Sequence, residues 1–520
     1  MATSRYIQTK IVVRHARTRA LYAHLPRRAI RKSVAGGGIG HKFLAGSTHC
    51  PYYAPMPKIL SRSFRLVCTP EQVSGVEALL RAQGYDFEPE PFSPYCRRLI
   101  AEPRPLGGSL AAFFGYIYIQ DRSSMLPPLA LAPAPGSAAL DMCASPGSKT
   151  GFLAQLVGRT GFVLGNEPSP TRLGTLRANL HQLNLIQAAT CSYSGDALPM
   201  RPGSWDNILL DPPCSGWGTA EKHPQVLKLW QGDKLDSLTG LQRRLLRHAA
   251  SLLRPGGRLV YSTCTTNVNE NEAQVRFAEE ELGLERVPLE PFAGFVWEEL
   301  PGGEGTLRVD GERSQAQGFY VALLRKPGQP DTADFCAHAA PLNDNPGVRS
   351  TADALSSVQN DFRPAPRAGK PGGRIRGSNP ARQERPLGSP LPLESLASST
   401  CDPALLPPGQ AVLYGDHVRF VPPHATALIP AACVWQGALL GKLGGGLLDA
   451  APRLRVLMPQ KPEDSAAASL VLEDVADITA LLSGQSRQTG LAGRDAALWW
   501  RDLPLGRVVL KQGRVVASFK

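Results

Sequence analysis

The stretch LDMCASPGSKTGFLAQL, residues 140–156, decides the fold. It is typical of a short buried strand that runs into a tight turn and then a helix. Asp141 lies near the end of the strand, and Gly147 lies where the backbone must come close to a ligand. Many such turns only cap helices, so the turn alone is weak evidence. Glu167 closes the next strand in GFVLGNEPSP, and a carboxylate there can accept hydrogen bonds from both ribose hydroxyls of a nucleoside.

Strands and helices alternate around this stretch, over residues 116–327. The strand candidates are the apolar runs AALDMCA, GFVLGNE, NILLD and GRLVYSTC. This alternation predicts an α/β fold, with a Rossmann-like, doubly wound parallel sheet covered by helices on both faces. Asp196 and Asp211 continue the series of acids at strand ends. Asp196 could simply cap a turn and Asp211 end a strand. Open α/β sheets bind ligands at the carboxyl ends of their strands, however, and this favours a binding role.

Two cysteines fall at the ends of neighbouring predicted strands. Cys214 follows Asp211 and two prolines, and Cys264 ends the strand LVYSTC. Either cysteine alone could be a buried structural thiol, which is the commoner fate of free cysteine. A thiolate beside a nucleoside site can instead add to carbon 6 of a pyrimidine ring. That addition makes carbon 5 nucleophilic, which methylation of this carbon requires.

Four segments carry a resemblance to a known family. The segments PGSKT, ILLDPPCSGWGT, LLRPGG and LVYSTCTTNVNENE resemble the Sun-type (Nol/Nop/Sun) RNA cytosine-5 methyltransferases. Within this family the sequence is most similar to the RsmF-type bacterial ribosomal RNA methyltransferases, through PGSKT, YIYIQDRSSMLPPLAL and the closing LPLGRVVLKQGRVVASF. The likeness covers residues 64–326 well and the tail loosely. Ser145 and Pro212 stand where the family usually has alanine, and these changes leave the catalytic groups intact.

The resemblance implies a class I methyltransferase sheet that uses S-adenosylmethionine and no metal. It implies that Cys264 is the nucleophile, that Cys214 releases the product, that Asp211 contacts the base and that Lys149 is an active-site lysine. The cofactor-binding residues that it implies are Cys143, Ala144, Ser145, Pro146, Gly147, Ser148, Lys149, Glu167, Asp196 and Asp211. The expected substrate is a cytosine of ribosomal RNA. Transfer RNA, or a catalytically silent role as an RNA-binding assembly factor, remain the alternatives.

A different methyltransferase class is disfavoured by one position. Enzymes that methylate exocyclic amines carry an aromatic residue after Asp-Pro-Pro, which stacks on the target base, whereas this chain has Cys214 there. DNA cytosine methyltransferases also attack with a proline-cysteine thiol. The second cysteine motif and the flanking units fit RNA better, because RNA targets are presented as splayed single-stranded bases.

The flanks of the sheet predict further units. Residues 1–59 form a basic leader, expected to be disordered or not native, since residues 1–65 hold thirteen Lys or Arg and no Asp or Glu, against a net charge of +13 for the whole chain. An RNA-binding arm, a transit peptide and sequence upstream of the true start codon are all open for it. We expect a small α+β RNA-recognition unit over 60–115, a methyltransferase domain over 116–327, a disordered linker over 328–400 and a β-rich, PUA-like RNA-binding domain over 401–520.

The cysteine pattern and the hydropathy of the sequence indicate the cellular compartment of the protein. Ten cysteines are scattered without metal-type spacing, which favours free thiols in a reducing compartment. No apolar run is long enough to span a bilayer. We therefore expect a cytoplasmic protein that works as a monomer on RNA.

Overall fold

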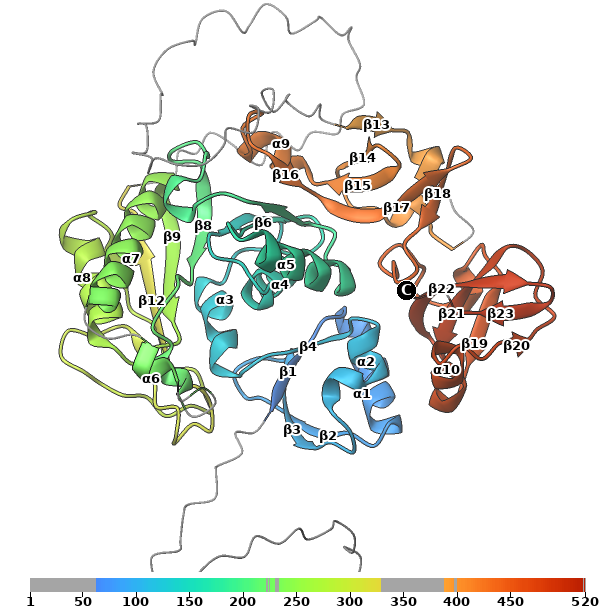
Figure 1. Cartoon of the computed structure of the whole chain (residues 1–520), viewed down its shortest axis with the longest axis horizontal. Helices are drawn as coiled ribbons and strands as arrows, with labels where there is room; N and C mark the ends of the chain where they lie inside the picture. Colours follow the sequence, from blue (N-terminus) through green and yellow to red (C-terminus); the bar gives the residue numbers. More distant parts are fainter. Residues whose placement is uncertain are drawn as a thin grey trace, which may run out of the picture. The chain divides into compact units, whose positions relative to one another are not determined.

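The computed structural model describes residues 62–220, 223, 225–229, 233–328, 388–396, 400–517 and 519. The predicted leader over 1–59 and most of the predicted linker lie outside these residues. Everything below concerns the compact unit that begins at Ile59 (Figure 1).

A nine-stranded sheet forms the centre of the described chain. Its strand order is β10-β12-β9-β8-β5-β6-β7-β16, with β11 paired to β12. The parallel strands are β5 (Ala138–Asp141), β6 (Phe162–Asn166), β7 (Ala188–Cys191), β8 (Trp205–Leu210) and β9 (Leu253–Thr263). The antiparallel strands are β10 (Glu285–Val287), β11 (Leu307–Val309), β12 (Phe319–Arg325) and β16 (Trp435–Gln436). All four strands quoted from the sequence are present, and the predicted α/β Rossmann-like sheet is confirmed. The sheet is mixed rather than wholly parallel as predicted, because β10, β11, β12 and β16 pair antiparallel at its edges.

Helices cover both faces of this sheet (Figure 1). They are α3 (Leu126–Leu131), α4 (Ser148–Val157), α5 (Pro170–Gln182), α7 (Asp233–Leu252) and α8 (Glu272–Glu280). The short helix α6 (Val226–Leu229) contacts the turn Trp217–Thr219 that follows β8. Adjacent strand residues pack into different cores because side chains alternate along a strand. Leu164 belongs to the core that holds Leu245 of α7 and Phe277 of α8, whereas Val163 belongs to the core with Leu153 of α4. Every side chain of β6 is buried, as expected for a strand that is covered on both sides.

The order of the strands creates a site at one edge of the sheet. From β5 the chain runs outward through β6 to β7, and then returns to the other side of β5 to form β8 and β9. The direction of winding thus reverses between β5 and β8. Loops after the two strands diverge at such a reversal, and they leave a crevice at the carboxyl ends of the strands.

A smaller antiparallel sheet precedes the central one. Its order is β2-β3-β1-β4, formed by β1 (Ser63–Leu66), β2 (Asp86–Pro89), β3 (Cys96–Ala101) and β4 (Ile117–Ile119). Helices α1 (Val73–Ala82) and α2 (Leu110–Phe113) accompany it. Val76, Leu79 and Leu80, three of the apolar positions that predict the first helix, are buried on α1. Strand β4 lies beyond residue 115, so this sheet extends past the boundary drawn from the sequence.

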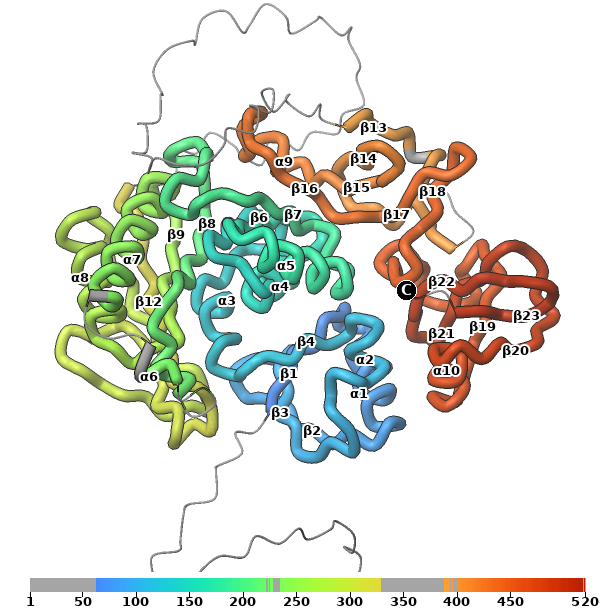
Figure 2. Tube along the Cα trace, in the orientation of Figure 1, coloured from blue at the N-terminus to red at the C-terminus, as the bar shows by residue number. Residues whose placement is uncertain are grey.

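The tail contains two five-stranded sheets (Figure 2). The first consists of β13 (Ser389–Leu391), β14 (Gln410–Tyr414), β15 (His417–Val421), β17 (Ala438–Gly444) and β18 (Leu447–Ala450). The second consists of β19 (Ser469–Leu472), β20 (Arg487–Gln488), β21 (Asp495–Trp500), β22 (Leu503–Lys511) and β23 (Arg514–Val516). The tail also contains the helices α9 (Pro423–Leu428) and α10 (Val475–Leu482). Strand β13 falls inside the interval 328–400, so the expectation of disorder is wrong for that segment, because its backbone pairs with β14.

The second tail sheet packs against the first sheet of the chain. Phe64 and Leu79 share one hydrophobic core with Leu498 and Val508. The guanidinium of Arg455 donates a hydrogen bond of 2.9 Å to the carbonyl of Gly115. The tail is therefore not packed as one independent domain, because about half of it contributes to the core of the amino-terminal unit.

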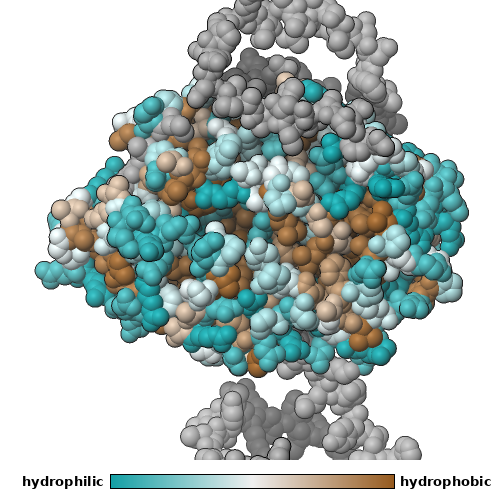
Figure 3. All heavy atoms as spheres, turned by 180° about the vertical axis from the view of Figure 1, so that it is seen from behind, coloured by the Kyte–Doolittle hydropathy of each residue, from teal (hydrophilic) through white to brown (hydrophobic). Residues whose placement is uncertain are grey.

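The surface mixes apolar and polar side chains. On the face seen in Figure 3, hydrophobic residues gather near the middle while hydrophilic residues dominate the margins. Large hydrophobic side chains that stay exposed include Ile100, Leu227 and Val434. Among the described residues, no helix has the length and apolarity needed to cross a membrane.

Candidate active site

An ion pair joins the first turn of α4 to the end of β8. Lys149 Nζ lies 2.7 Å from Asp211 Oδ2, and Ser262 Oγ donates a 2.9 Å hydrogen bond to Asp211 Oδ1. Burial lowers the pKa of Lys149, but the charge and hydrogen bond of Asp211 outweigh burial, so the pKa is raised overall. Lys149 therefore stays protonated, and it holds the Asp211 carboxylate in one orientation.

The two predicted cysteines meet beside this pair. Cys214 Sγ lies 3.2 Å from Cys264 Sγ, and both are free thiols. The hydrogen bond from Cys214 lowers the pKa of Cys264 below its usual value, against the effect of burial, and nearby Lys149 lowers it further. The same contact raises the pKa of Cys214 well above its usual value. Cys264 is therefore the thiol that ionises first, and Cys214 is the thiol that keeps its proton.

A close backbone approach fixes the loop after β8 against the loop after β9. Gly218 N donates a 3.0 Å hydrogen bond to the carbonyl of Cys264. A Cβ atom at Gly218 would lie 2.9 Å from that carbonyl oxygen and 2.1 Å from the carbonyl oxygen of Gly318. Only glycine fits there without a backbone shift, which explains the second glycine of the sequence GWGT.

The turn predicted to bind a cofactor is held against α5. Gly147 is the residue that caps the start of α4, and its φ of +103° is a left-handed conformation that glycine adopts readily. Ser145 Oγ donates 3.0 Å to the carbonyl of Arg172, and Asn179 Nδ2 donates 2.7 Å to the carbonyl of Pro146. These contacts hold the turn at the start of α4, where the first backbone N–H groups of a helix have no partner within the helix and can bind a ligand.

Asp141 ends β5 beneath this turn. Its Oδ2 accepts 2.7 Å from Thr150 Oγ1, and its Oδ1 accepts 3.3 Å from the backbone N–H of Cys143. Burial raises the pKa of Asp141 to about 6. Ala144 N donates 2.9 Å to the carbonyl of Asn166, which ties the turn to the end of β6. Asp141 thus supports the turn from below through its two oxygens.

Glu167 and Asp196 lie at the ends of the next two strands. Glu167 is 1% exposed, accepts 2.9 Å from Ser169 N, and lies 3.4 Å from Arg172 Nη1. Asp196 accepts from Ser194 Oγ and, at 2.9 Å, from Arg244 Nε. Hydrogen bonds from Ser194 and Arg244 lower its pKa. The structure thus brings Lys149, Asp211 and both cysteines into one cluster, and it places Glu167 and Asp196 at adjoining strand ends with other partners.

Residues 128–325 match the family described as 16S rRNA methyltransferase RsmB/F. This match runs from within α3 to the end of β12, so it contains all the parallel strands of the central sheet. Over 275 residues it is 37% identical to ribosomal RNA small subunit methyltransferase F of Salmonella typhi, covering 51% of this chain and 57% of the relative. The protein of the same name from Cronobacter sakazakii is 35% identical over 295 residues, which are 54% of this chain and 60% of the relative. The chain thus matches less than two thirds of the length of these relatives.

A solved structure is also similar to this chain. It is a methyltransferase homolog protein from Pyrococcus horikoshii, with 31% sequence identity and a TM-score of 0.46. The match covers 52% of this chain and 87% of that one.

The RsmB/F family consists of S-adenosylmethionine-dependent methyltransferases, and the residues at this site fit that cofactor. Four carboxylates, Asp141, Glu167, Asp196 and Asp211, end or follow consecutive parallel strands at the reversal of winding. Contact of Glu167 with the ribose hydroxyls stays a prediction from the sequence.

Several residues of the site were not singled out from the sequence. Thr150, Ser262, Ser215 and Glu270 all make hydrogen bonds to the predicted residues or to their immediate neighbours. Each of these four residues lies inside one of the segments that carry the family resemblance. That position is the sequence signal that points to them. Thr150 bonds to Asp141 nine positions away, whereas the partners of Ser262 and Ser215 lie 51 and 55 positions away and are revealed by the three-dimensional arrangement.

Proposed function

We propose that the chain is an S-adenosylmethionine-dependent RNA cytosine-C5 methyltransferase that acts on ribosomal RNA through a covalent cysteine adduct. The observation that carries the proposal is the 3.2 Å contact between Cys214 and Cys264, in which Cys264 has the lowered pKa. One thiol has a lowered pKa and the other a raised pKa, and both lie next to an aspartate that a lysine holds in place. This arrangement suits a reaction that needs a nucleophile first and a base later.

The first step is addition of the thiolate to the base. Cys264 Sγ bonds to carbon 6 of the cytosine, and the electron pair of the C5–C6 double bond moves toward carbon 5. Asp211, oriented by Lys149 and Ser262, would accept a hydrogen bond from the exocyclic amine of the cytosine, and the Lys149 ammonium would offset the negative charge that moves into the ring. S-Adenosylmethionine, when bound, supplies the electrophilic methyl group.

The last step restores the aromatic ring. The proton on carbon 5 leaves, its electron pair re-forms the C5–C6 double bond, and the bond from carbon 6 to Cys264 breaks. The Cys214 pKa is raised first by its contact with Cys264. Once Cys264 is bonded to carbon this cause disappears, so Cys214 ionises more easily at the stage when a base is needed. This order of events supports a release role for Cys214.

The test of this proposal is covalent capture. RNA that contains 5-fluorocytosine cannot lose the substituent on carbon 5, so the adduct with Cys264 should persist on a denaturing gel in the presence of S-adenosylmethionine. An exocyclic amine methyltransferase would leave the RNA free. A silent assembly factor would show no heat of binding for S-adenosylmethionine. Methyl transfer to transfer RNA in preference to ribosomal RNA would favour the alternative substrate.

Glu167→Ala is expected to weaken binding of S-adenosylmethionine by tenfold or more, because hydrogen bonds to a charged group contribute about 1.5–3 kcal/mol each. Isothermal calorimetry on the full chain measures this change. Glu281→Ala, at an exposed carboxylate at the end of α8, is the control and should bind normally. Equal affinity in the Glu167 variant would remove this residue from the cofactor site.

The tail and the small amino-terminal sheet are proposed to contact RNA, with the tail as the PUA-like element. A cavity of about 240 Å³ supports this, because Arg177, His181 and Arg419 line it. Arg177 Nε donates to Thr190 Oγ1 and Arg419 Nη1 to the carbonyl of Gly437, each at 2.9 Å. Neither guanidinium has a carboxylate partner among the residues that the structure describes. Burial, and then the charge of Arg177, lower the pKa of Arg419. An incoming phosphate would relieve this repulsion.

Replacing both Arg177 and Arg419 by alanine is expected to weaken RNA binding by about tenfold and to reduce the slope of log affinity against log salt by about 1 to 2, because two phosphate contacts are lost. Filter binding over a range of salt concentrations gives both numbers. Arg325→Ala removes an arginine that is ion-paired with Glu285 and should change neither. An unchanged salt slope in the double variant would show that this cavity does not hold phosphate.

The proposed location is the cytoplasm. Every cysteine that the structure describes is a free thiol, including the pair at 3.2 Å. A thiol that serves as nucleophile must stay reduced, and reducing compartments maintain that state.

A further inference from the structure

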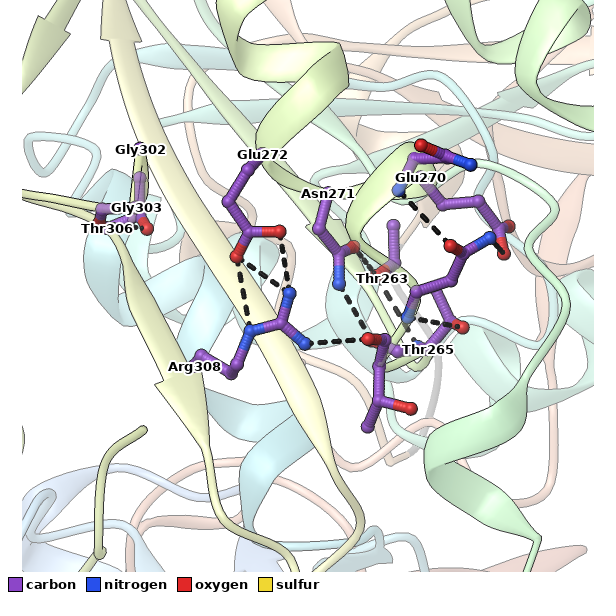
Figure 4. Close-up of polar contacts among 12 residues, drawn as sticks. Thr263, Thr265, Glu270, Asn271, Glu272, Gly302, Gly303, Thr306 and Arg308 are labelled. Atoms are coloured by element: carbon purple, nitrogen blue, oxygen red, sulfur yellow. Dashed lines mark hydrogen bonds and ion pairs between the residues drawn. The ribbon is translucent and has the colours of Figure 1, made fainter. Parts of the chain in front are cut away.

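A buried carboxylate links the loops that carry the two cysteines. Glu270 is fully buried, at the end of the short 3-10 turn Val268–Glu270 that follows β9 (Figure 4). Its Oε2 accepts 2.9 Å from Ser215 N and 3.0 Å from Gln242 Nε2. Its Oε1 accepts 2.5 Å from Ser215 Oγ and 3.0 Å from Asn267 Nδ2. Four donors converge on one side chain, and only an acceptor-only group such as a carboxylate satisfies all four.

These donors belong to the loop that positions Cys214. Ser215 follows Cys214 in the chain, and both its backbone N–H and its hydroxyl point to Glu270. Gln242, on α7, donates from the same Nε2 to the carbonyl of Pro213 at 3.0 Å. The residues on both sides of Cys214 are therefore tied to Glu270, one directly and the other through Gln242.

The same network reaches the loop of Cys264. Ser215 Oγ lies 2.7 Å from Thr265 Oγ1, and Thr265 follows Cys264 in the chain. Because the Ser215 hydroxyl donates its proton to Glu270, the Thr265 hydroxyl must donate in this contact. The backbone carbonyl of Glu270 also accepts 2.7 Å from the hydroxyl of Tyr261 on β9. Glu270 is thus connected to both cysteine loops through hydrogen bonds.

We propose that Glu270 is a positioning residue that holds Cys214 and Cys264 within reach of each other, and that both adduct formation and product release depend on its carboxylate. The inference rests on the proposed function for its catalytic consequence. A neighbouring glutamate, whose contacts indicate a purely structural role, serves as the comparison. Glu272 is 1% exposed and makes a bidentate ion pair with Arg308 at 2.6 to 3.1 Å, but it has no hydrogen bond to Ser215 or Gln242 among the described contacts (Figure 4).

The test compares Glu270→Gln with Glu272→Gln. In Glu270→Gln an amide NH₂ group replaces one carboxylate oxygen, and it cannot accept hydrogen bonds from the donors that face it. The two cysteine loops should therefore move apart. We expect the single-turnover rate of adduct formation with 5-fluorocytosine RNA to fall by about a hundredfold, as a misplacement of about 1 Å can cause. The KM values for RNA and S-adenosylmethionine should stay within about threefold of the parent. Glu270→Asp keeps the charge and should recover part of the rate. Glu272→Gln should lose thermal stability while the folded fraction keeps its rate.

A second readout is independent of RNA. Alkylation of Cys264 by iodoacetamide, followed by mass spectrometry of its peptide as pH is varied, reports its ionisation. Since contact with Cys214 lowers the pKa of Cys264, separating the thiols in Glu270→Gln should move the alkylation midpoint to higher pH. If Glu270→Gln does not fold, Ser215→Ala removes one donor from the same carboxylate and should shift the midpoint in the same direction by less.

The outcomes separate the two proposals. Unchanged alkylation and an unchanged adduct rate in folded Glu270→Gln, or an equal loss of rate in Glu272→Gln, would overturn the positioning role. A parent protein that forms no adduct, with an alkylation midpoint that still shifts in Glu270→Gln, would overturn the proposed function and leave the positioning role standing.

Discussion

Cys264→Ala is expected to abolish both methyl transfer and covalent capture of 5-fluorocytosine RNA, while binding of S-adenosylmethionine stays intact. Cys264 has the lowered pKa of the pair, so its removal takes away the thiolate that must bond to carbon 6. Cys214 is not expected to replace it as nucleophile, because Cys214 follows β8 whereas the attacking sulfur is held after β9. Transfer of a labelled methyl group, with a denaturing gel for the adduct, measures the change.

The control for this variant is a cysteine outside the cluster. Cys433 is buried and free, but it packs in the core beside Leu428 and Ile429. Cys433→Ala should keep full activity apart from a modest loss of stability. Normal turnover by Cys264→Ala would contradict the assigned nucleophile and, with it, the covalent route.

Cys214→Ala is expected to accumulate an adduct with ordinary cytosine RNA and to turn over about a hundredfold to a thousandfold more slowly, because a base that assists removal of the carbon 5 proton is lost. A stable protein–RNA band without any fluorinated base is the readout. Cys214→Ser, which retains a donor of similar size, should resemble Cys214→Ala in release, because a hydroxyl does not ionise at neutral pH.

The same variant carries a pH signature. The hydrogen bond from Cys214 lowers the pKa of Cys264, so its removal should raise that pKa, and the midpoint of adduct formation should move to higher pH. Adduct formation by Cys214→Ala should therefore lag at neutral pH and recover in more alkaline buffer. A rapid release of product by this variant, without any band, would show that another group removes the proton.

The central sheet and the cysteine cluster could be predicted because their signals are local. Each of the four quoted strands is a short apolar run, and burial on both faces requires such a run. Asp211 and Cys264 follow directly after two of these strands, so predicting the strands also places the residues at one edge. Lys149 was placed by its motif, and the 2.7 Å contact with Asp211 agrees with that placement.

Other features depend on partners that lie far away in the sequence. Strand β16 consists of two residues, Trp435 and Gln436, which is too short for any periodicity, yet it pairs with β7 across more than 240 residues. Glu270 sits in a polar run that reads as a solvated loop, and its burial follows from donors on α7 and after β8. Arg65 was counted with the basic leader, although its guanidinium is buried 4.7 Å from the centroid of the Phe152 ring.

The core that Phe64 and Leu79 share with Leu498 and Val508 has a consequence for how the protein is made. A chain that emerges from the ribosome exposes the first sheet early, and the residues that cover it are synthesised more than 400 positions later. Until then the apolar face of the first sheet is exposed and prone to aggregation, and chaperones that bind such surfaces can protect it. Closure between sequence positions so far apart also carries a large loop entropy, so formation of this core should be among the slower events in folding.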